Sequence, residues 1–131
     1  MAIPQMLSET LIEGTSGLYT FALVDEAGAA IDPGFLDALT VTARDRDTNA
    51  PVNGRDKQDI LNTNDGTVET DPGPPITTIV TLELQPEDTV ILNQHRRVEY
   101  RILAFRWTWD SGRRVAGHEI QFGIENSMYE A

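Results

Sequence analysis

Five oxygen-bearing side chains between residues 45 and 56 fall at the spacing of a calcium-binding loop. They occupy the first, third, fifth, ninth and twelfth positions of a twelve-residue segment: Asp45, Asp47, Asn49, Asn53 and Asp56. The match is incomplete, because Ala50 stands where such a loop needs glycine and Asp56 stands where it has a bidentate glutamate. Asp and Asn also stabilise ordinary turns, so a solvated loop is the simpler interpretation and calcium the weaker alternative.

The two histidines, His95 and His118, are the other residues suited to catalysis or metal binding. Neither has a second histidine or an acid at metal-ligand spacing, and Glu119 points away from His118 if both lie on a strand. The chain has no G-x-G-x-x-G and no phosphate-binding glycine loop, and spacing alone assigns no Ser-His-Asp arrangement. We therefore predict no catalytic residue and no cofactor, and we do not expect an enzyme.

The two tryptophans offer a different chemistry, which is stacking on sugar rings. Trp107 and Trp109 lie two residues apart and share one face of a predicted strand. An outward face would make them a platform like that of carbohydrate-binding modules. Leu103 and Phe105 continue the same face, which favours a place in the core because aromatic side chains dominate buried area.

Basic charge gathers near the end of an otherwise acidic chain. The net charge is −11, with 16 acidic and 4 basic residues in 1–90 (−12) and 5 acidic and 6 basic residues in 91–131 (+1). Such a balance argues against general nucleic-acid binding. Solvated strand edges are the simpler account of the cluster, and a patch for an acidic surface, such as the acidic half of a neighbouring copy, is the sharper one. The candidate contact residues are Arg96, Arg97, Arg101, Arg113 and Arg114.

Alternation from residue 98 to residue 126 predicts the long antiparallel hairpin that would position most of these groups. One face of its first strand carries Leu103, Phe105, Trp107 and Trp109, and Arg101 extends that face. One face of its second strand carries Ala116, His118, Ile120, Phe122 and Ile124. The turn residues between them include Gly112, since glycine tolerates positive φ.

Shorter apolar runs and turn signals fill the rest of the chain. Strands are predicted over 18–24, 39–44 and 76–84, with brief ones near 29–31, 68–70 and 90–92. We expect a helical turn at 35–39, a hairpin turn at 64–66 and a short helix opened by Pro86. About seven strands and no long helix predict an all-β, immunoglobulin-like antiparallel sandwich ending in a long hairpin, with a closed barrel as the alternative.

Length and composition predict one domain in a reducing compartment. The 131 residues divide into an N-terminal arm or first edge strand (1–16), a sandwich domain (17–126) and a tail (127–131). There is no cysteine, and the first residues lack the basic region and long apolar run of a signal peptide. No stretch approaches the ~18 apolar residues of a membrane span. We expect synthesis in a cytoplasm and no membrane partner.

Three stretches resemble a known family. Residues 99–126 (EYRILAFRWTWDSGRRVAGHEIQFGIEN) and 21–31 (FALVDEAGAAI) are similar to small immunoglobulin-like proteins of tailed-bacteriophage virions, as is the run LTVTARDRDT with the N-G turn that follows it. The resemblance covers most of 18–126, although the chain lacks the inter-sheet cysteine pair of antibody domains. It implies a virion structural protein of the neck, tail, baseplate or capsid. Such a protein would assemble as a homo-oligomer with other virion proteins, without catalysis; a carbohydrate- or cell-surface-binding module is the alternative.

Overall fold

The computed structural model describes residues 5–6, 11–25, 27–31, 34, 36–73, 76–93 and 95–126. This part of the chain is all-β: it holds nine strands in two sheets, three of them only two residues long, and a 3-10 helix, η2 (Pro86–Thr89). Pro86 opens η2, as predicted. No helix in these ranges has the length and apolar character to cross a membrane. The predicted tail, 127–131, lies outside the described residues.

Sheet A is built around the C-terminal half of the chain. Its order is β1 (Gln5–Met6), β9 (Arg114–Glu125), β8 (Val98–Trp109), β4 (Leu36–Asp45) and β5 (Gln58–Asp59), and β2 (Leu11–Ile12) also pairs with β9. Sheet B has the order β3 (Gly17–Ala22), β7 (Thr77–Leu84) and β6 (Gly66–Asp71). The predicted arm therefore contributes two short strands, and both run parallel to β9 in sheets that are otherwise antiparallel.

Strands β8 and β9 pair along their whole length, from Val98 opposite Glu125 to Trp109 opposite Arg114. The turn between them uses positive φ at Asp110, Ser111 and Gly112. The alternation of the sequence correctly predicted which side chains of these strands face the core. Trp107 is 1% exposed, and Phe105, Ile120, Phe122 and Ile124 are also buried.

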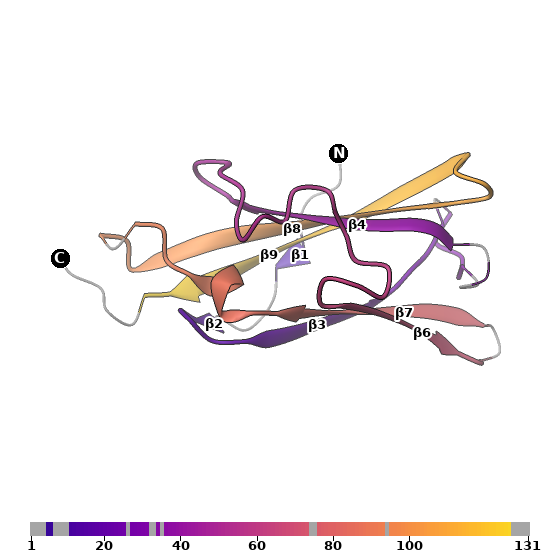
Figure 1. The fold of residues 1–131 in the computed structure, drawn as a ribbon, viewed down its shortest axis with the longest axis horizontal. Coiled ribbons are helices and arrows are strands. Elements are labelled where there is room, and N and C mark those ends of the chain that lie inside the picture. The colour runs from indigo at the N-terminus through magenta and orange to yellow at the C-terminus, as the bar shows by residue number, and fades with distance from the viewer. Residues whose placement is uncertain are drawn as a thin grey trace.

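The core lies between the two layers, which Figure 1 shows with β4, β8 and β9 in one layer and β3, β6 and β7 in the other. Val80, Leu82 and Leu84 come from sheet B, and they join the buried residues of β4, β8 and β9 in one cluster. Aromatic rings cross between the layers, with the ring centroids of Phe21 and Phe105 4.6 Å apart. Large aromatic side chains thus bridge the two sheets.

Four local predictions were wrong because pairing between distant strands overrode them. The helical turn expected at 35–39 is wrong for 36–39, which belong to β4, and residue 35 lies outside the described residues. Residues 29–31 give only the isolated bridge of Ala30 with Val24, and 90–92 form no strand. The expected hairpin turn at 64–66 has the positive φ of turn chemistry, but it carries the chain from β5 in sheet A to β6 in sheet B. Glycine is needed at Gly66, because a Cβ there would collide with the Ile60 carbonyl.

Candidate functional site

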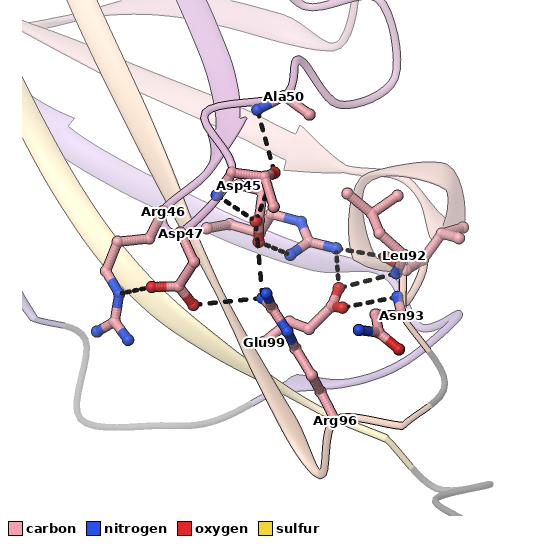
Figure 2. Close-up of polar contacts among 11 residues, drawn as sticks. Asp45, Arg46, Asp47, Ala50, Leu92, Asn93, Arg96 and Glu99 are labelled. Carbon is pink, nitrogen blue, oxygen red and sulfur yellow. Dashed lines mark hydrogen bonds and ion pairs between the residues drawn. The ribbon is translucent and has the colours of Figure 1, made fainter.

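Arg101 brings several of the predicted site residues together. It lies on the core face of β8 and is 1% exposed. Its Nη1 donates to Asp45 Oδ1 at 3.0 Å, and its Nη2 donates to Glu99 Oε1 at 2.8 Å and to the Val90 carbonyl. Its Nε is buried without a hydrogen-bond partner among the described residues. Figure 2 shows Asp45 and Glu99 converging on this centre from β4 and β8.

The two buried carboxylates around Arg101 are further stabilised by other donors. Glu99 accepts hydrogen bonds from the backbone N–H groups of Leu92 and Asn93, both at 2.8 Å. Asp45 accepts from Thr48 N at 3.0 Å and from Thr48 Oγ1 at 2.8 Å. Burial alone would raise the pKa of Asp45, but the Thr48 hydrogen bonds and the charges of Arg101 and Arg96 hold it below its ordinary value. The carboxylate is therefore ionised and internally compensated.

The five residues of the calcium pattern do not converge on one point in the structure. Asp45 points at Arg101, and Asp47 contacts Arg96, with Asp47 Oδ2 and Arg96 Nη1 3.3 Å apart (Figure 2). Asn53 turns away and donates to Asp88 Oδ1 at 3.1 Å. Asn49 and Asp56 are both exposed: Asn49 closes a turn through its backbone N–H on the Asp45 carbonyl, and Asp56 lies in the loop before β5. Within the described ranges no three His, Asp or Glu side chains gather as metal ligands would.

The predicted arginine patch is divided between the two ends of β8. Arg96 and Arg97 precede the strand, whereas Arg113 and Arg114 lie exposed beyond its other end. A twelve-residue strand spans roughly 40 Å at ~3.3 Å per residue, so these side chains do not form one surface. The Arg114 guanidinium lies over the Trp109 ring, 5.2 Å from its centroid. Arg101 belongs to neither group, because its side chain is buried.

His118 is a packing residue that is hydrogen-bonded to Tyr19. The Tyr19 hydroxyl and His118 Nε2 are 2.6 Å apart, and their rings stack. Burial lowers the pKa of His118 and raises the pKa of Tyr19. Both shifts favour a neutral pair, in which the tautomer of His118 sets which group donates. His95 is exposed and far from this pair in the fold, with its backbone N–H on Asn93 Oδ1.

The tryptophans lie in the core and form no outward platform. Trp107 and Trp109 are 1% and 6% exposed. The indole Nε1 of Trp107 donates to the Val24 carbonyl at 3.1 Å, which satisfies its one polar group inside the protein. Sugar stacking on this pair of rings would require the core to open.

A second buried arginine was missed by the sequence reasoning. Arg55 binds Asp88 with both branches of its guanidinium, Nε to Oδ1 at 2.6 Å and Nη2 to Oδ2 at 2.8 Å. It also reaches Asp65 Oδ2 at 3.0 Å and Gln58 Oε1 at 2.7 Å. The hydrogen bond to Asp88 raises the pKa of Arg55 and outweighs burial, which would lower it. No local pattern connects residues 55 and 88, because the contact depends on how the two loops meet.

A shallow hollow of about 860 Å³ opens on the outward face of sheet A. Its lining includes Thr40, Thr42, Ala104 and Gly117, which alternate with the core residues of β4, β8 and β9. These residues are small, so they leave a depression between the larger side chains around them. Among those larger side chains are Lys57 and Arg106, which make no ion pair with the described residues.

Each buried charge is paired with an opposite charge, and the outward face of sheet A has a hollow lined by Lys57 and Arg106, which make no ion pair with the described residues. Comparison of the chain with protein-family models, with curated proteins and with solved structures finds no match.

Proposed function

We propose that this protein is a non-catalytic structural protein of a tailed-bacteriophage virion with an immunoglobulin-like β-sandwich fold. It is made in the host cytoplasm and works in the virion, where repeated copies bind each other and other structural subunits. Weak contacts suffice in a symmetric assembly, because neighbouring contacts raise the effective concentration of each one. The negative net charge keeps free copies apart and soluble before assembly.

The order of the strands in the two sheets is the observation that supports the immunoglobulin-like fold in this proposal. In an immunoglobulin-like sandwich the second, fifth and fourth strands (B, E, D) share one sheet, and the third, sixth and seventh (C, F, G) share the other. The six longer strands here, taken in chain order as B to G, give β3-β7-β6 and β4-β8-β9. In that order β5 takes the place of the additional strand C′ found in variable-type domains.

The surface offers contact sites of three kinds for assembly. Arg96, Arg97, Arg113 and Arg114 supply exposed or half-exposed positive charge. Strands β3 and β6 are the edges of sheet B among the described residues, and edge strands are ready templates for pairing with another chain. The short strands β1 and β2 show that the arm already adds to an edge of sheet A.

Particle composition and gene context test the proposal. Antibodies raised against the purified chain should label tailed particles at one fixed position in electron micrographs. Portal, capsid or tail genes should flank the gene. A metabolic operon around the gene, together with particles that lack the chain, would remove the proposal.

The carbohydrate-binding alternative loses the feature that motivated it. It relied on Trp107 and Trp109 as an exposed stacking surface, and both indoles lie in the core. A glycan array would still test this alternative directly. Binding to a glycan would revive the alternative if that binding survives substitution of the exposed Arg113 but not of the core-facing Trp109.

A further inference from the structure

The basic residues of this chain are confined to one of its two sheets. Residues 1–43 and 58–95 contain no lysine or arginine, so all ten basic residues belong to strands of sheet A or to the loops beside them. None lies in β3, β6 or β7, which make up sheet B. The two outward faces therefore differ in charge, although the whole chain is acidic.

The outward face of sheet A presents two unpaired cations at the rim of a hollow. Lys57 and Arg106 both line the hollow of about 860 Å³, together with Val115, which is 41% exposed. Of the nearby carboxylates, Glu119 lies 3.9 Å from Arg44, and Asp59 accepts the Leu61 N–H at 3.0 Å, as Asp71 on sheet B accepts the Gly73 N–H at 3.2 Å. The face thus keeps free positive charge beside an apolar rim.

The outward face of sheet B presents the opposite features. Glu69, Asp71 and Glu83 point outward, because the residues that alternate with them on β6 and β7 face the core. None of the three carboxylates makes an ion pair with the described residues. Leu18, opposite Glu83 on β3, is 72% exposed and forms an apolar projection next to that carboxylate.

From these two faces we infer that copies of this chain associate front to back, with sheet A of one copy receiving sheet B of the next. Leu18 enters the hollow beside Val115, and the carboxylates of sheet B meet Lys57 and Arg106. Such a contact joins two different surfaces, so it is heterologous, and it closes into a ring or grows into a stack according to the rotation between copies. The inference goes beyond the proposed function, because it concerns the isolated chain and holds or fails without a virion.

Salt should affect this association in two opposite ways. The net charge of −11 repels copies over long distances when little salt is present. At about 0.15 M salt the Debye length is ~8 Å, so the long-range repulsion is screened while close contacts persist. Association should therefore be strongest near that ionic strength and weaken again at about 1 M, where the Debye length is ~3 Å.

Sedimentation equilibrium of two complementary variants tests the geometry. Arg106→Glu disables the sheet A face, and Glu83→Lys disables the sheet B face. We expect each variant alone to associate at least about tenfold more weakly than the wild-type chain, since like charges then meet across the contact. Mixed together, they should associate again, because the sheet A face of Glu83→Lys still fits the sheet B face of Arg106→Glu, and the reversed charges at positions 106 and 83 attract each other across the remaining contact.

A matched control carries the same charge change as Glu83→Lys elsewhere. Glu87→Lys on η2 alters an exposed residue away from both faces and should associate like the wild-type chain. Lys57→Glu and Leu18→Ser provide second variants of each face, and near-ultraviolet circular dichroism establishes that every variant is folded.

Three outcomes would overturn the inference. They are a wild-type chain that stays monomeric at every concentration and salt level, a mixture of the two variants that does not associate, or single variants that self-associate as well as the wild-type chain. The first two would leave the virion proposal intact, since contacts with other subunits do not require this surface.

Discussion

Arg55 and Arg101 are both 1% exposed, yet the protein neutralises the two buried guanidinium groups differently. Arg55 donates hydrogen bonds from all three nitrogens of its guanidinium group. It grips Asp88 through two parallel hydrogen bonds and also binds Asp65, Gln58 and the Asn64 carbonyl at 3.1 Å. Only Asp88 among its carboxylates is fully buried, because the Asp65 side chain is 35% exposed.

Arg101 makes fewer hydrogen bonds but balances more buried charge. Its two carboxylates, Asp45 and Glu99, are each 1% exposed, and its own Nε has no partner among the described residues. A ranking by hydrogen bonds places Arg55 first, whereas a ranking by buried charge places Arg101 first. Comparing Arg55 with Arg101 therefore separates the contribution of hydrogen bonds from that of buried charge, two contributions that usually coincide in buried ion pairs.

Replacing Arg101 should have the largest effect on stability. Arg101→Met should lower the free energy of unfolding by about 4–5 kcal/mol, near the upper end for breaking a buried pair, because two carboxylates lose their central cation. Urea unfolding followed by the fluorescence of the buried tryptophans measures it.

Replacing Arg55 should cost less, although it removes more hydrogen bonds. Arg55→Met should lower the free energy of unfolding by about 3 kcal/mol. Asp88 keeps the Gln85 N–H at 2.7 Å and the Asn53 amide, and water can reach Asp65. A larger loss for Arg55→Met than for Arg101→Met would show that hydrogen-bond geometry, and not buried charge, sets the cost.

Lysine substitutions should distinguish more clearly between the effect of hydrogen-bond geometry and the effect of buried charge. A lysine ammonium restores the charge without the planar fork. Arg101→Lys should therefore recover more than half of the loss seen with methionine, whereas Arg55→Lys should still cost about 2 kcal/mol, because one ammonium cannot reproduce the bidentate contact with Asp88. Equal recovery at the two positions would contradict this reading.

Lowering the pH should reduce the difference in the free energy of unfolding between the wild type and Arg101→Met. In the wild type the pKa of Asp45 is lowered, so its contribution is present above the unfolded value of about 3.9 and is lost as pH falls through the folded value. In the variant Asp45 lacks the Arg101 charge that helps to lower its pKa, so the stability of the variant depends less on this titration. The difference should shrink by about 1–2 kcal/mol between pH 5 and pH 2 in parallel urea titrations. A constant difference would indicate a packing defect instead.

The smallest effect should come from the exposed part of the same network. Arg96 and Asp47 form an ion pair whose side chains are 32% and 44% exposed. Arg96→Ala should change the free energy of unfolding by about 0.5 kcal/mol, and about 0.5 M added salt should remove most of that difference. A change as large as that of Arg55→Met would mean that Arg96 is essential for keeping Asp45 ionised in the interior.

The alternation of residues close together in the sequence predicted much of this fold. Alternation identified the core faces of β8 and β9, and it placed Arg101 in line with Leu103 and Phe105. It did not reveal that Arg101 is buried, since an arginine at the end of an apolar face is usually solvated. The missing information was the positions of Asp45 and of the 90–93 loop, which approach it from other parts of the chain.

The sequence by itself determined the all-β class, the apolar faces and the turn at the tip of β8 and β9, because these depend on residues two to four positions apart. Tertiary structure alone decided which loops enclose Arg55, that 64–66 connects two sheets, and that cations and free carboxylates lie on opposite outward faces. Those features depend on which strands pair, and pairing is settled by the summed burial of many side chains distant in sequence.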